Sequence, residues 1–179
     1  MTCIAGLVDK GKVYIGGDSA GVTGFDVCIR TDEKVFKKNN MIFGFTSSFR
    51  MGQLIRYKLK IPDHDPRIDD YEYLCSNFID ELIKCFKDNG YATINNNEVQ
   101  GGVFLLGYNK NLYKIESDFQ VGKIIDKFNA CGCGESFALG ALYATKEDII
   151  DPEVRVIQAL KSAEYFSGGV RGPFNIVSI

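Results

Sequence analysis

The second residue of the chain is a threonine whose side chain and backbone nitrogen could together perform nucleophilic catalysis. Thr2 stands directly before a strand-like apolar run, residues 3–8, so we expect it at the rigid end of a strand. If Met1 is removed, Thr2 carries both a hydroxyl and a free α-amine. An α-amine has an unperturbed pKa of about 7.7–8.0, so much of it is neutral near neutral pH and can accept the hydroxyl proton. One residue would then supply both the nucleophile and the base.

A nucleophile of this kind works better with three supporting groups. A nearby cation disfavours the protonated amine, a carboxylate holds that cation, and backbone N–H groups stabilise the oxyanion. Asp18 follows a predicted strand, and Lys34 begins another. Ser47 and Ser48 lead into a predicted helix, whose first turn would point N–H groups outward. The chain therefore offers a candidate for every part of such a site.

The order and spacing of these residues resemble the proteasome β-type subunits, which are N-terminal nucleophile hydrolases. The chain is also similar to the peptidase subunit of the bacterial two-component ATP-dependent protease. The resemblance covers nearly the whole chain. It includes Gly132-Cys133-Gly134, where the family has Gly-Ser-Gly, and Glu164-Tyr-Phe-Ser167-Gly-Gly, where the family has Asp-x-x-Ser-Gly-Gly. Ser48 stands where the family usually has glycine.

The resemblance implies a threonine peptidase on an α+β fold, a four-layer α-β-β-α sandwich. It implies that Thr2 attacks the scissile carbonyl, Lys34 tunes the Thr2 amine and Asp18 orients Lys34. The Ser47 and Ser48 amides would hold the oxyanion. The remaining catalytic-site positions of the family fall on Cys133, Glu164 and Ser167.

Four residues match the family's substrate-binding positions, where the side chain that precedes the scissile bond is recognised. Because Asp32 and Arg50 carry opposite charges, they do not select a basic or an acidic side chain. The resemblance also implies polypeptide substrates, homo-oligomeric stacked rings and an ATPase unfoldase as partner. The four residues are Gly21, Asp32, Thr46 and Arg50.

Each of these residues also has an ordinary structural interpretation. Asp18 could be a turn residue, Lys34 a solvated charge, and Ser47 and Ser48 a helix N-cap. Cys133 is the one competing nucleophile, but the single histidine, which could serve as its base, lies in a proline-flanked loop. Only the joint occurrence of the motifs favours the threonine mechanism. Two alternative functions remain: a non-catalytic ring or scaffold subunit, and an N-terminal nucleophile amidase that acts on a small amide.

Length and composition predict one globular domain over residues 1–179. Apolar residues make up 45% of the chain and charged residues 25%, and the net charge is −2, values that are ordinary for a globular domain. The absence of a basic block argues against nucleic acid as the main partner, and no apolar run has the length of a membrane span. The six cysteines come without a secretion signal, so we expect a reduced, cytoplasmic protein. Cys131-Gly-Cys133 lacks the spacing of common zinc motifs, so we expect no metal or cofactor.

The hydrophobic pattern predicts strands, two helices, strands, two helices and a final strand. Residues 95–100 are polar and are predicted as a loop. This order suits two stacked sheets with a helix pair on each outer face. Helices are expected over 49–59, from 69 or 70 to about 90, 135–145 and 152–166, and strands over 2–8, 13–15, 27–29, 34–36, 41–45, 102–108, 112–115, 128–131 and 173–179.

Overall fold

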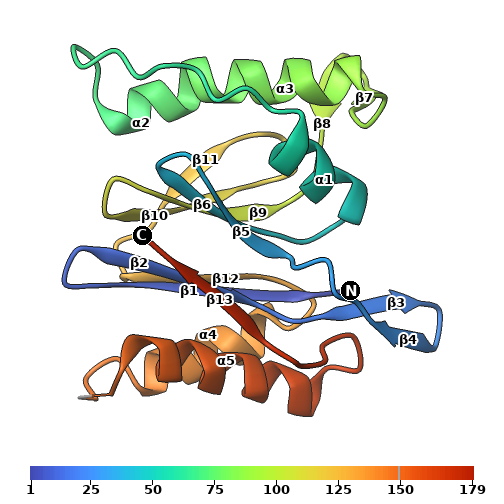
Figure 1. Ribbon diagram of the computed structural model, residues 1–179, viewed down its shortest axis with the longest axis vertical. Helices are drawn as coiled ribbons and strands as arrows, with labels where there is room; N and C mark the ends of the chain where they lie inside the picture. The colour runs from blue at the N-terminus through green and yellow to red at the C-terminus, as the bar shows by residue number, and fades with distance from the viewer. Residues whose placement is uncertain (149) are drawn as a thin grey trace.

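The computed structural model describes residues 1–148 and 150–179 and has four layers (Figure 1). Two antiparallel sheets lie face to face at the centre, and helices cover both outer faces. One sheet has the order β12-β1-β2-β13, from β1 (Cys3–Asp9), β2 (Lys12–Gly17), β12 (Phe128–Gly132) and β13 (Asn175–Ser178). The other has the order β11-β10-β9-β6-β5, from β5 (Val35–Lys38), β6 (Met41–Phe45), β9 (Phe104–Tyr108), β10 (Asn111–Ile115) and β11 (Val121–Lys123).

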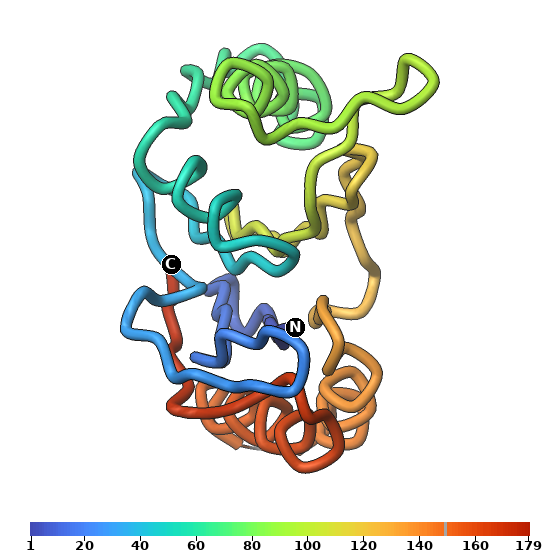
Figure 2. The backbone as a smooth tube through the Cα atoms, turned by 90° about the vertical axis from the view of Figure 1, so that its right-hand side faces the viewer, coloured from blue at the N-terminus to red at the C-terminus, as the bar shows by residue number. Residues whose placement is uncertain are grey.

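The helices form the two outer layers, and two hairpins project from the sandwich. Over the five-stranded sheet lie α1 (Phe49–Tyr57), α2 (Asp70–Tyr73), the π-helical turn η1 (Leu74–Phe78) and α3 (Ile79–Asp88). Over the four-stranded sheet lie α4 (Glu135–Ala144) and α5 (Pro152–Phe166). The hairpin β3–β4 (Ala20–Thr23, Asp26–Ile29) extends beside the N-terminus in Figure 1, and β7–β8 (Thr93–Asn95, Glu98–Gln100) stands out in Figure 2.

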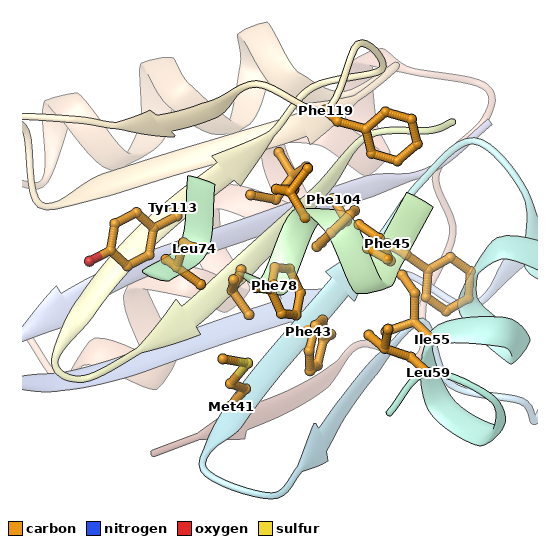
Figure 3. Packing of buried hydrophobic residues seen from close by; sticks show 14 of the residues in the cluster. Met41, Phe43, Phe45, Ile55, Leu59, Leu74, Phe78, Phe104, Tyr113 and Phe119 are labelled. Atoms are coloured by element: carbon orange, nitrogen blue, oxygen red, sulfur yellow. The ribbon is translucent and has the colours of Figure 1, made fainter. Parts of the chain in front are cut away.

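Three apolar clusters fill the spaces between the four layers. The largest joins the upper helices to the five-stranded sheet, and its aromatic side chains, including Phe43, Phe78 and Phe104, interlock in Figure 3. A second lies between the two sheets around Ile4 and Leu105, and a third lies under α4 and α5. The central strands are therefore buried on both faces, which is why they read as continuous apolar runs in the sequence.

The predicted four-layer α-β-β-α fold is confirmed, and most element positions agree with the sequence pattern. The prediction of a loop over 95–100 was wrong, because this segment forms the β7–β8 hairpin. Its turn residues Asn96 and Asn97 have φ angles of 49° and 68°, as a two-residue hairpin turn requires. The strands β3 and β11 were also not predicted, because their sequences, AGVT and VGK, each contain a glycine and only one β-branched apolar residue.

No helix within the described residues has both the length and the apolar character that a membrane crossing requires. Within the same ranges, no group of three or more His, Cys, Asp and Glu side chains is arranged to hold a metal ion.

Candidate active site

Sheet topology brings Thr2, Asp18 and Cys133 to one end of the four-stranded sheet. Thr2 immediately precedes β1 and Asp18 immediately follows β2, and these strands pair antiparallel with Ile4 opposite Gly17. On the other side of β1, Cys3 lies opposite Gly132, so Cys133 also lies beside Thr2. Antiparallel pairing places the start of one strand next to the end of its neighbours, so residues far apart in sequence meet here.

Asp18 and Lys34 form a buried ion pair that joins the two sheets. The Lys34 Nζ donates to Asp18 Oδ1 at 2.8 Å and to the Ala20 carbonyl at 2.6 Å. The two side chains are 0% and 1% exposed. Asp18 also accepts backbone N–H groups from Cys3 and Ala20 at 3.0 Å and from Arg171 at 3.4 Å. The carboxylate is therefore surrounded by donors, as a buried charge must be.

Burial and charge act on Lys34 in opposite directions. Removal from water disfavours the ammonium and lowers the pKa of Lys34, while the adjacent Asp18 carboxylate opposes that shift. Lys34 lines the same cavity as Thr2, about 100 Å³ in volume. A cation in this place raises the free energy of a second cation nearby, so it would favour the neutral form of a Thr2 α-amine.

Cys133 contacts the backbone nitrogen of Thr2, the atom that becomes the α-amine if Met1 is removed. Thr2 N–H donates to Cys133 Sγ at 3.3 Å, and the thiol donates back to the Thr2 carbonyl at 3.3 Å. The Ser167 hydroxyl in turn donates to Cys133 Sγ at 3.4 Å. Cys133 thus accepts hydrogen bonds from both the Ser167 hydroxyl and the Thr2 nitrogen.

Gly132 allows this close approach of Cys133 to Thr2. Its φ is +100°, and a Cβ there would overlap the carbonyl oxygen of Thr2. A residue with a side chain would therefore be both strained and obstructed. The glycine before Cys133 keeps β12 close enough to β1 for the thiol to reach the Thr2 backbone.

The Ser47–Ser48 turn differs from the expected oxyanion site. The Ser48 N–H donates to the Thr46 carbonyl at 2.7 Å, across Ser47 at a φ of +63°. The Ser48 hydroxyl caps α1 by accepting from Arg50 N–H at 3.0 Å, and the Ser47 hydroxyl accepts from Val103 N–H at 3.0 Å. In this conformation the Ser48 N–H is already used in a hydrogen bond within the turn. It can serve an oxyanion only if the turn exchanges that internal bond for one to substrate.

Glu164 supports the loop that contacts Asp18. Its carboxylate accepts the Gly172 N–H at 2.9 Å. The adjacent Arg171 donates its N–H to Asp18 and accepts from Ser19 N–H at 2.9 Å. Among the hydrogen bonds of residues 1–148 and 150–179, Glu164 has none to Thr2. The geometry therefore gives Glu164 a positioning role that acts through the 171–173 loop.

Neither of the two cavities at this end of the molecule is lined by all four expected substrate-binding residues. Thr46 lines the cavity that contains Thr2, whereas Asp32 lines a second cavity of about 100 Å³. Arg50 lines neither of these two cavities and is exposed. Gly21 packs under Arg30, because a Cβ on it would come within 2.8 Å of the Arg30 Cδ.

Phe49 and Arg30 shape this region, and the sequence analysis missed both. Phe49 borders both cavities, as does Phe45. The Arg30 guanidinium lies over the Phe49 ring, 3.7 Å from its centroid, and is held by two hydrogen bonds to Asp32 at 2.7 and 2.6 Å. The Arg30-x-Asp32 spacing was the only local sequence signal of this ion pair. Nothing in that spacing identified the Phe49 ring as the partner of Arg30.

The chain is similar to solved structures over almost its whole length. No family model and no curated protein matches it. BPH from Thiobacillus denitrificans in complex with epoxomicin superposes with a TM-score of 0.83 at 18% identity, over 99% of this chain and 98% of that one. A second structure of that BPH gives 0.82 at 18% identity, with 99% and 97% covered. Eukaryotic HslV from Trypanosoma brucei gives 0.74 at 19% identity, with 99% and 98% covered.

The fold expected from the sequence is confirmed. At 18–19% identity the likeness to BPH and HslV establishes the shared architecture.

The ion pair predicts how stability depends on pH. Asp18→Asn should cost about 3–5 kcal/mol, because it leaves the Lys34 ammonium buried without its carboxylate. The pKa of Lys34, already lowered by burial, falls further, while in the unfolded chain it stays near about 10.4. Between these two pKa values the unfolded chain binds more protons, so stability rises with pH.

Urea unfolding at several pH values from about 7 to 9 measures this effect. The free energy of unfolding should rise more steeply with pH in Asp18→Asn than in the wild type. Asp26→Asn, at an exposed position on β4, is the matched control and should keep the wild-type slope. Equal slopes in all three proteins would contradict the assigned pair.

Proposed function

We propose that this chain is a threonine peptidase subunit in which Thr2, freed of Met1, cleaves peptide bonds of unfolded polypeptides. The observation that carries the proposal is the buried Lys34–Asp18 pair on the cavity of Thr2. Burial of a lysine ammonium costs free energy, and Lys34 lies where its charge would favour the neutral form of the Thr2 α-amine. The complex of BPH with epoxomicin supports the proposal, since a protein of the same fold binds that compound.

In the proposed reaction the Thr2 α-amine takes the hydroxyl proton as Oγ1 attacks the scissile carbonyl. The tetrahedral intermediate then expels the amine product, which takes the proton from the α-ammonium, and an ester to Thr2 remains. Water, deprotonated by the same amine, hydrolyses the ester and releases the carboxylic acid. Asp18 holds Lys34 in place throughout.

We further propose that the chain is a single domain that assembles into homo-oligomeric stacked rings supplied by an ATPase unfoldase. Exposed aromatic side chains support assembly. Phe25 at the tip of the β3–β4 hairpin is fully exposed, and Phe166 is 64% exposed while it stacks on Phe137 with centroids 5.2 Å apart. Native mass spectrometry separates this proposal from a small-amide amidase, for which a ring is not required.

The experiment that tests catalysis is intact mass before and after treatment with a peptide epoxyketone, which requires both the hydroxyl and the free amine. The wild type should lack Met1 and gain one inhibitor mass on Thr2. Thr2→Ala should gain none and should lose hydrolysis of unfolded polypeptides, because the covalent step needs the hydroxyl.

Thr23→Ala, an exposed threonine on β3, is the control and should react as the wild type does. Retained Met1 in protein from its native host would favour the non-catalytic scaffold function. Substantial turnover by Thr2→Ala would overturn the threonine mechanism.

Cys133 is expected to act as a hydrogen-bonding partner of the Thr2 amine. Cys133→Ser should keep or raise kcat/KM, because a hydroxyl donates and accepts more strongly than a thiol. Cys133→Ala should lower kcat/KM several-fold, since the contact to the Thr2 nitrogen at 3.3 Å is lost. Peptide hydrolysis with mass mapping of the adduct measures this, and Cys28→Ser, exposed on β4, is the control. An inactive Cys133→Ser enzyme, or an adduct on Cys133, would assign the nucleophile differently.

The cavity beside Thr2 predicts a preference for small apolar side chains before the scissile bond. The cavity has a volume of about 100 Å³ with Met1 in place. Phe45 and Phe49 line both this cavity and the second one, so the two rings still bound the space that removal of Met1 would enlarge. Phe49→Ala should join the two cavities and raise kcat/KM for a substrate with phenylalanine there about tenfold or more relative to alanine. Tyr57→Ala changes only the second cavity and should leave the ratio unchanged. An unchanged ratio in Phe49→Ala would exclude this cavity as the specificity site.

A further inference from the structure

A second cavity, of about 300 Å³, lies at the far end of the sandwich. It is lined by residues from the end of β1, the start of β10 and the 124–127 connection between β11 and β12. Figure 2 shows this connection running along one edge of the molecule from one sheet to the other. Val8 borders the cavity, and six residues of strand at about 3.3 Å each separate it from Thr2 by about 20 Å. The cavity is therefore distinct from the candidate active site.

The charges around this cavity are predominantly positive. Lys110, Lys123 and Lys127 line it, and Asp126 is the single acidic residue on its wall, so three positive charges and one negative charge leave +2. The whole chain carries −2. Among the ion pairs formed within residues 1–148 and 150–179, none includes any of these three lysines. Their ammonium groups are thus available to an anion.

The buried side of the cavity carries a donor without a partner. Asn129 is 4% exposed, and its Oδ1 accepts the Ala130 N–H at 2.8 Å. That bond identifies the other side-chain atom as Nδ2, which has no hydrogen-bond partner within the described part of the chain. Phe128 and Ala130 pack toward α4 and α5, so strand alternation directs Asn129 into the space between the sheets.

A buried amide donor without a partner costs about 1–3 kcal/mol, and a hydrophobic residue at the same place would avoid that cost. Nδ2 itself is covered, and a ligand atom that accepts from it after a small rotation of the Asn129 side chain toward the cavity would remove that cost. Apolar residues also line the cavity, among them Val8, Leu112 and Ile124, and could pack against a carbon skeleton. At about 300 Å³ the volume lies at the lower limit of small-molecule sites.

We propose that this cavity binds a small organic phosphate, with the phosphate among Lys110, Lys123 and Lys127 and the organic part accepting a hydrogen bond from Asn129. Ammonium groups bind phosphate oxygens through charge-assisted hydrogen bonds, while the apolar walls and the amide favour an organic body over a bare anion. The site is independent of the peptidase function, and it holds whether or not Thr2 is catalytic.

Isothermal titration with AMP and with ribose 5-phosphate tests the proposal, and inorganic phosphate and adenosine serve as comparison ligands. At least one organic phosphate should bind at least tenfold more tightly than either comparison ligand. Asn129→Asp keeps the acceptor for Ala130 N–H but replaces the donor with a carboxylate, and it should weaken binding at least tenfold. The double variant Lys123→Gln/Lys127→Gln should weaken binding by about tenfold and reduce its salt dependence.

Lys161→Gln, on the exposed face of α5, should bind as the wild type does. Thermal unfolding checks that each variant is folded. If Asn129→Asp is not folded, the binding measured with the lysine double variant tests the proposal. The proposal is overturned if neither organic phosphate binds at millimolar concentration, if inorganic phosphate binds equally well, or if folded Asn129→Asp and the double variant both keep wild-type affinity.

Discussion

The ion pair between Lys34 and Asp18 is the interaction on which the candidate site depends. Asp18 directly follows β2 of one sheet, and Lys34 directly precedes β5 of the other. Both side chains are inaccessible to water. Two charges are stable in such a place only when their hydrogen-bonding capacity is filled. The pair therefore requires both sheets to be docked in one register, and the cavity beside Thr2 exists only in that docked state.

The ion pair also ties distant parts of the chain to one carboxylate. Asp18 receives Cys3 N–H from β1 and Arg171 N–H from the segment after α5. Glu164, at the end of α5, holds the same segment through Gly172. A change at Glu164 can therefore reach Lys34 through three hydrogen bonds, those of Gly172 to Glu164, of Arg171 to Asp18 and of Lys34 to Asp18. This coupling is the reason to treat Glu164 as a positioning residue.

Sequence reasoning was strongest where function depends on the order of strands and weakest where it depends on packing between them. Thr2, Asp18 and Cys133 flank strand ends, and antiparallel pairing alone brings such positions together. The state of the Ser48 amide depends on Ser47 adopting a positive φ, which no local pattern signalled.

The residues that sequence reasoning missed share a dependence on distant partners. The stacking of Arg30 on Phe49 joins segments from different layers. Within the described residues Asn129 Nδ2 has no hydrogen-bond partner, and this becomes visible only once β12 has been packed at the edge of its sheet. Hydrophobic periodicity and motif spacing carry no information about such contacts between layers, or about the lack of a hydrogen-bond partner.

With Met1 present, the candidate catalytic groups of Thr2 are all engaged. The Thr2 nitrogen is part of a peptide bond, its hydroxyl donates to the Met1 carbonyl at 2.5 Å, and Met1 lines the cavity. Meanwhile Lys34, Asp18 and Cys133 already hold their places. Removal of one residue would free the base, release the hydroxyl and enlarge the cavity without rearranging the groups around them. The supporting groups of the candidate site are therefore in place while Met1 is still attached, and cleavage of a single bond separates this arrangement from one with a free nucleophile.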